Sequence, residues 1–176
     1  MSFANRGVTE KMALNDDGDL VRGLGYVALY AAYLEEAIED VFTAVSAVNG
    51  MRDPRMDRWQ ISRKLDHIRQ SISQWPQLTD ELARFLTCID PLTQLLERRN
   101  LVIHGRIYAD PNTGDVLKPA RVGYPDVPAV AADLYDLANE LFAARNPCLN
   151  ASMFAIPRYA MEQEGSHHLS ASGIDG

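Results

Sequence analysis

The sequence predicts an all-α protein, a bundle of four or five helices with a small β-hairpin inserted before the last helix. Apolar residues recur every three or four positions along most of the chain, the spacing that gathers them on one face of an α-helix. Turn-forming pairs such as Asn49-Gly50 and Asp53-Pro54 divide these stretches. Before the last of them, residues 106–118 hold two short apolar runs around a turn-rich centre, a pattern typical of a hairpin.

The first predicted helix is long and carries two apolar stripes. Its main stripe steps by four and three from Leu20 to Val48, and Asn49-Gly50 ends it. A second stripe on its flank is aromatic and consists of Tyr26, Tyr30 and Tyr33. A helix with two apolar stripes is buried on two sides, so we expect either the same chain or a partner to cover the tyrosines.

Two or three helices are predicted next. One runs from about residue 55 to residue 74, where Trp75-Pro76 stops it. The stretch 78–104 allows two interpretations. In one, a third helix starts near Thr79 and a fourth begins at Asp90-Pro91, with the aspartate as N-cap and the proline in the first helical position. In the other, a single kinked helix runs from 78 to 104.

The last part of the chain is predicted to hold the hairpin and the final helix. Pro119 keeps the second strand short or at an edge of the sheet. The final helix is expected over about 127–145, with Asn146-Pro147 as its end. A short apolar segment after it is expected to pack back onto the bundle, through Met153, Phe154, Ile156 and Tyr159.

A chain of 176 residues is most simply one domain. Residues 1–15 show no periodicity, which predicts a flexible N-terminal arm. Residues 16–160 form the single helical domain, and residues 161–176 are polar and rich in Gly and Ser, which predicts a disordered tail.

The composition is that of an ordinary globular protein, with 47% hydrophobic and 23% charged residues. The longest apolar run, 23–34, is too short to span a bilayer, and no secretion signal is visible, so no membrane association is predicted. Cys88 and Cys148 lack paired spacing, which argues against a disulfide framework or a zinc site and fits a reducing, cytoplasmic location. We therefore predict no metal and no cofactor.

The net charge of −7 is unusual for a protein that holds RNA mainly through its phosphates. Two stretches are nevertheless locally positive, residues 52–69 and residues 98–121. Alternating charges on a solvated helix face explain both stretches equally well.

The most informative stretch is Arg98 to Arg106, which reads Arg-Arg-Asn-Leu-Val-Ile-His-Gly-Arg. His104 follows Asn100 by four residues, so both side chains lie on one helix face. Arg99 lies roughly 140° around the helix from His104, and its long side chain can reach the same place. A cation, an amide and an imidazole at a helix end can bind a phosphate and move a proton.

A purely structural interpretation competes with this one. Basic residues in a last turn complement the helix dipole, and Gly105 would be a left-handed residue just beyond the helix end. The position of Arg99 counts against it. Arg99 falls on the apolar stripe of this segment, where an unpaired charge is costly; the other members of the stripe are Leu92, Leu95, Leu96, Val102 and Ile103.

Arg99, Asn100 and His104 resemble the Arg-Asn-x-x-x-His signature of the HEPN superfamily, over about residues 19–145. These proteins are small helical bundles, and many are metal-independent ribonucleases of defence and toxin systems. The resemblance implies that His104 acts as general base or acid, that Arg99 stabilises charge on the phosphate, and that Asn100 holds the histidine ring or the phosphate. It also implies a homodimer in which two motifs face one cleft.

Further side chains are predicted to support the motif. Glu35 directly follows the stripe residue Leu34 and is placed to pair with Arg99, with Glu36 and Glu39 as substitutes. Two more arginines flank the motif and add positive charge, namely Arg98 and Arg106.

Three functions remain open from the sequence. The leading one is a HEPN-like endoribonuclease with RNA as substrate and an antitoxin or another protein as partner. The second is a non-catalytic HEPN-like module for interaction or nucleic-acid binding, which the acidic charge favours. The third is an unrelated bundle that binds a small ligand among its tyrosines. Catalysis requires His104 to be exposed in a shared positive cleft, whereas a buried His104 bonded to backbone favours the inert module.

Overall fold

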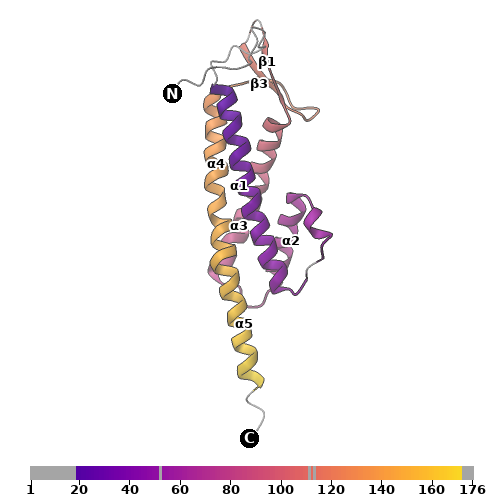
Figure 1. Ribbon diagram of the computed structural model, residues 1–176, viewed down its shortest axis with the longest axis vertical. Coiled ribbons are helices and arrows are strands. Elements are labelled where there is room, and N and C mark those ends of the chain that lie inside the picture. The colour runs from indigo at the N-terminus through magenta and orange to yellow at the C-terminus, as the bar shows by residue number, and fades with distance from the viewer. Residues whose placement is uncertain (1–18, 52, 111, 113, 172–176) are drawn as a thin grey trace.

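The computed structural model describes residues 19–51, 53–110, 112 and 114–171. The arm predicted for residues 1–15 lies outside this part of the chain. Two long helices, α1 (Asp19–Val48) and α4 (Ala131–Asn150), lie side by side and form the long axis of the molecule (Figure 1). No helix in the described ranges is both long enough and apolar enough to cross a membrane.

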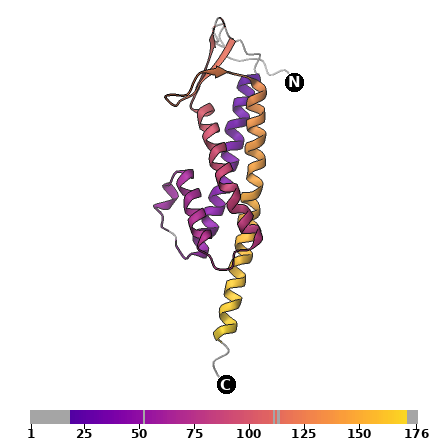
Figure 2. The ribbon, with the colours of Figure 1, turned by 180° about the vertical axis from the view of Figure 1, so that it is seen from behind.

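The other elements are arranged around this pair. Helix α3 (Asp80–Ile103) packs on both long helices, and the shorter α2 (Ile61–Ser73) packs against α1 and α3. A small sheet closes one end of the molecule, and α5 (Ile156–Ala171) extends from the other (Figures 1 and 2). The predicted fold class, an all-α bundle with a hairpin before the last long helix, is confirmed.

The main stripe of α1 supplies the centre of the core. Val27, Leu34 and Ile38 are fully buried, as are Val41 and Val45 further along the helix. Each such side chain contributes about 1.5–3 kcal/mol relative to an exposed one. They pack against buried residues of the neighbouring helices, among them Leu65, Ile68, Ile72, Leu82, Ile89 and Leu141.

The helix predicted over 55–74 begins later than expected. Residues 56–58 form a single 3-10 turn, and α2 starts only at Ile61 because Trp59 and Gln60 are extended. The break turns the Trp59 ring toward Phe42, with 6.1 Å between ring centroids. The local helical pattern is thus overridden by packing of the indole against α1.

The stretch 78–104 forms one helix, the second of the two interpretations. Thr79 is its N-cap, since its Oγ1 accepts a hydrogen bond from the Leu82 N–H at 3.3 Å. Pro91 lies inside the helix, and Asp90 pairs with Arg69 of α2 and does not cap a new helix. An internal proline costs about 3 kcal/mol. The buried side chains on both sides of it, Ile89 and Leu92, offset that cost.

The hairpin is present and gains a third strand. Strand β1 (Arg106–Asp110) pairs antiparallel with β2 (Gly114–Lys118), and residues 111 and 113 of its turn lie outside the described residues. Strand β3 (Val127–Pro128) pairs with the other edge of β2. The last long helix was predicted from residue 127, but those residues are used in β3, so α4 begins at Ala131.

Helix α4 also runs past its predicted end at Asn146-Pro147. It continues to Asn150 and leads through a π-helical turn, Ala151–Ala155, into α5. Cys148 and Ile156 are buried, so the apolar face continues beyond the proline. Tyr159 stacks on Trp75 at 4.5 Å between centroids and donates a hydrogen bond to the carbonyl of Pro76.

Two residues of the segment expected to pack back, Ile156 and Tyr159, are therefore buried, whereas Met153 and Phe154 are exposed. Helix α5 reaches Ala171 and so includes part of 161–176, where the sequence predicted disorder.

The tyrosine stripe is covered in part by α4. The Tyr30 ring lies 5.0 Å from Phe142 and 5.7 Å from Tyr26, and Tyr26 lies 5.9 Å from Tyr135. Tyr26 and Tyr33 remain more than one third exposed. The same chain thus covers one side of the stripe, and its other side faces solvent.

Candidate functional site

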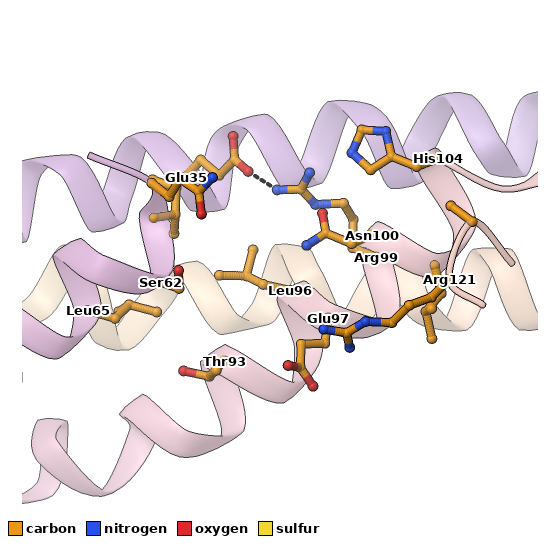
Figure 3. Close-up of a pocket in the computed structure, with 14 residues that line it drawn as sticks. Glu35, Ser62, Leu65, Thr93, Leu96, Glu97, Arg99, Asn100, His104 and Arg121 are labelled. Carbon is orange, nitrogen blue, oxygen red and sulfur yellow. Dashed lines mark ion pairs between the residues drawn. The ribbon is translucent and has the colours of Figure 1, made fainter. Parts of the chain in front are cut away.

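A cavity of about 620 Å³ opens where α1, α2, the end of α3 and the β2–β3 loop meet (Figure 3). The predicted motif residues Arg99, Asn100 and His104 all line it, together with Glu35. The remaining lining residues are Gln60, Ile61, Ser62, Leu65, Thr93, Leu96, Glu97, Leu101, Ala120 and Arg121. None of the three tyrosines of α1 belongs to this lining.

His104 is the C-cap of α3 and is exposed. Its backbone N–H donates to the Asn100 carbonyl at 3.2 Å, which holds the residue at the helix end, and its ring stands at the edge of the cavity (Figure 3). The structure thus meets one part of the arrangement expected for catalysis, the exposure of His104.

Gly105 follows the end of α3, and its role differs from the left-handed cap that the sequence predicted. It is not among the residues with positive φ, so it is not a left-handed cap. A Cβ atom at this position would lie 2.6 Å from the Leu101 carbonyl oxygen and 2.9 Å from Leu117 Cδ1. The glycine therefore lets β2 approach the end of α3 closely, which sets His104 beside the loop that completes the cavity.

Arg99 reaches across the cavity to α1 and pairs with Glu35 (Figure 3). This predicted pairing is confirmed. The Arg99 side chain is 14% exposed and that of Glu35 is 37% exposed. The Nε atom of Arg99 is buried and finds no hydrogen-bond partner among the described residues. Desolvation lowers the pKa of Arg99 from its ordinary value, as expected for a cation drawn out of water.

The other acids considered for this role are engaged elsewhere or point outward. Glu39 binds Lys64 of α2, with both carboxylate oxygens 2.6 Å from Nζ. Glu36 is exposed on the outer face of α1.

The two flanking arginines do not reach the cavity. Arg98 turns to α4 and binds both carboxylate oxygens of Glu140, at 2.5 and 3.0 Å. This hydrogen bonding raises the pKa of Arg98 and lowers that of Glu140. Arg106 opens β1 and is exposed, outside the cavity lining.

Sequence reasoning missed several lining residues. Gln60 enters the cavity because the chain is extended just before α2, and Arg121 enters from the β2–β3 loop. The excess of basic residues in 98–121 was the one signal that included Arg121. No pattern in the sequence indicated Gln60.

The formal charges of the lining balance, since Arg99 and Arg121 face Glu35 and Glu97. An anion in the cavity would contact arginine donors but would not enter a strongly positive cleft. In the described part of the chain, no group of three or more His, Cys, Asp and Glu side chains is placed to hold a metal ion. The arrangement can bind an anion through Arg99 and Asn100 and can exchange a proton through His104.

Comparison of the chain with family models, curated proteins and solved structures gives no match.

Proposed function

We propose that this protein is a metal-independent endoribonuclease of HEPN type, acting in a defence or toxin–antitoxin system. One observation carries the proposal. The exposed imidazole of His104 shares a cavity with Arg99, whose guanidinium is held in place by Glu35 through Nη2. An oriented cation next to a free imidazole is the minimum needed to bind a phosphodiester and move its protons.

The proposed reaction is a transesterification within the RNA. The 2′-oxygen of a ribose bonds to the adjacent phosphorus, and the bond from phosphorus to the 5′-oxygen breaks. His104 takes the 2′-hydroxyl proton as general base, and a general acid returns a proton to the leaving 5′-oxygen. Arg99 stabilises the charge on the non-bridging oxygens, and Asn100 donates a hydrogen bond to one of them. The products carry 2′,3′-cyclic phosphate and 5′-hydroxyl ends.

The general acid is assigned to His104 of a second copy, because one chain brings one motif histidine to the cavity. Exposed apolar residues of α1 support a two-fold dimer. They are Val21, Tyr26, Leu29 and Tyr33. A monomeric mass in light scattering at tens of micromolar would contradict this assignment.

The test is RNA cleavage by the wild type and by His104→Ala. The assay uses single-stranded RNA at low salt with a chelator present, because phosphate contacts weaken as salt rises. We expect cleavage by the wild type and a loss of about 10²–10⁴-fold in His104→Ala, with an unchanged melting temperature. His67→Gln is the matched control, since His67 lies on α2 outside the cavity lining. Cleavage that persists in His104→Ala would show that this cavity is not the active site.

A non-catalytic RNA-binding or protein-binding module is the second candidate. The net charge of −7 and the balanced charges of the cavity favour it. Wild-type protein that binds RNA without cleaving it would establish this alternative.

A further inference from the structure

The cavity has two chemically different halves. One half holds the groups suited to a phosphate, Arg99 and His104. The other half has an apolar floor of Leu65 and Leu96, both buried. Figure 3 shows Leu96 between Arg99 on one side and Leu65 with Ser62 on the other. A volume of about 620 Å³ lies within the range of small-molecule sites, so the cavity has room beyond what a phosphate group occupies.

Two polar residues of the lining are neighbours in the chain of the elements that form this floor: Gln60 directly precedes α2, which carries Leu65, and Thr93 lies three residues before Leu96 on α3. Gln60 is exposed, its side chain makes no capping hydrogen bond to α2, and its backbone carbonyl is already used by the Lys64 N–H at 3.1 Å. The side-chain amide therefore offers both donors and its acceptor to a ligand. Thr93 donates its hydroxyl to the Ile89 carbonyl at 2.9 Å, which leaves it as an acceptor.

We propose that this half of the cavity is a base-recognition subsite, in which Gln60 reads the edge of the nucleobase next to the scissile phosphate. The proposal rests on the proposed function and names its substrate more closely: single-stranded RNA with an unstacked base at the cleavage point. The flat base lies on the Leu65–Leu96 floor while its phosphate meets Arg99.

The chemistry of a base matches this half of the cavity. Proteins read RNA sequence mostly on unstacked bases, which place a π-face on an apolar or aromatic surface and present a hydrogen-bonding edge to side chains. An amide has a donor and an acceptor side by side, so it pairs with an edge that has both. A carboxylate at the same position accepts only, and it favours an edge that donates, such as that of cytosine.

The first experiment maps cleavage sites in a randomised single-stranded RNA. Wild type should show a preference for one base at the cleavage point, and Gln60→Ala should reduce that preference by about tenfold. Gln60→Glu should shift cleavage toward bases whose edge donates. Gln70→Ala is the matched control, since Gln70 is an exposed α2 residue outside the cavity lining. An unchanged preference in both Gln60 variants, with wild type cleaving, would overturn the subsite and leave the proposed function standing.

A second measurement does not depend on cleavage. The four nucleoside 3′-monophosphates are titrated into wild type and Gln60→Ala by calorimetry, and circular dichroism confirms that the variant is folded. We expect wild type to discriminate among the four and Gln60→Ala to bind them with nearly equal affinity. Discrimination that depends on Gln60 in a protein that does not cleave RNA would support the subsite and refute the nuclease. Equal binding of the four by wild type would overturn the subsite.

Discussion

Two ion pairs connect α1 to neighbouring helices, and their members on α1 are one helical turn apart. The pairs differ in how many donors of the cation are already used. Glu39 binds Lys64 of α2, and Glu35 binds Arg99 of α3. In both pairs the cation is nearly buried and the carboxylate is partly exposed, with 4% and 39% exposure for Lys64 and Glu39 and 14% and 37% for Arg99 and Glu35.

The two cations differ in the donors that remain. The ammonium of Lys64 donates to both oxygens of Glu39 and to the Asp57 carbonyl at 3.0 Å, which accounts for all three of its N–H groups. Arg99 has five N–H donors, of which the Nε–H is buried, and its ion pair with Glu35 is made by one terminal nitrogen, Nη2, so the N–H groups of Nη1 remain for a ligand. Only the second pair lines the large cavity. We call the Glu39–Lys64 pair the closed pair and the Glu35–Arg99 pair the open pair. A closed pair only holds two helices together, whereas an open pair can also bind a ligand.

The largest expected effect is on the rate of RNA cleavage, which should depend on the open pair and hardly on the closed pair. Arg99→Lys should slow RNA cleavage by about 10³-fold, because an ammonium cannot hold Glu35 and clamp a phosphate as the guanidinium fork does. Lys64→Met should change the rate by less than about threefold at a temperature where the variant is folded. Single-turnover rates under chelating conditions provide the comparison. Equal losses in the two variants would show that both pairs act only through the fold.

The next effect is on the stability of the fold, where we expect the closed pair to contribute more than the open pair. Lys64→Met leaves Glu39 and the Asp57 carbonyl without their partner, and we expect a loss of about 2–3 kcal/mol in the free energy of unfolding. This is below the usual cost of breaking a buried pair, because Glu39 is 39% exposed and water replaces part of the contact. Arg99→Met should cost about 1 kcal/mol, since Glu35 faces an open cavity. Urea unfolding of both variants measures the difference, and a larger loss for Arg99→Met would break the comparison.

The open pair could be predicted from the sequence because local patterns define both of its members. Arg99 interrupts an apolar stripe, where a charge needs a partner, and Glu35 follows a core residue of the long first helix. The closed pair was missed. Lys64 appeared in a stretch of mixed charge typical of a solvated face, and its burial depends on the break at Trp59 and Gln60, which tertiary packing produces.

The same distinction, between features that local sequence patterns define and features that tertiary packing produces, applies to the fold. Helical periodicity predicted the bundle, and the turn-rich segment predicted the hairpin. Two prolines lie inside helices: at Pro91 the observed single helix is one of the two interpretations left open, whereas at Pro147 the predicted helix end is wrong. A proline is a local cost, and burial of the residues around it is a long-range gain that no short window of sequence contains. Gln60 and Arg121 reach the cavity from an extended break and a loop, whose positions no periodic pattern specifies.

A smaller effect tests the spare donors of Arg99. Glu35→Gln removes one negative charge from the cavity and should tighten the Kd for single-stranded RNA by about three- to tenfold at low salt, with the gain shrinking as salt rises. Glu39→Gln is the matched control, since its partner Lys64 has no free donor for a phosphate. Fluorescence anisotropy of labelled RNA with His104→Ala as background gives both affinities without cleavage. Equal tightening in the two variants would mean that overall charge, and not the open pair, controls binding.

The smallest expected effect is a pH dependence of the stability, which arises from His67 near the closed pair. His67 lies 5.5 Å from Phe42 and 5.6 Å from Trp59 between ring centroids, and its Nε2 is 3.4 Å from Ser71 Oγ. Burial lowers the pKa of His67 below its ordinary value of 6.5.

The sign of the effect follows from that direction. Between the lowered pKa and 6.5 the unfolded chain binds more protons than the folded one, so stability is highest above pH 6.5 and is lost as the pH falls through the folded value. His67→Gln should remove this part of the slope in urea unfolding between pH 7.5 and about pH 5. Protonated His67 would also add a second positive charge near Lys64, whose Nζ is 5.3 Å from the Phe42 ring that His67 contacts. A slope that is the same in wild type and His67→Gln would show that acid acts elsewhere and that the closed pair does not respond to pH in this range.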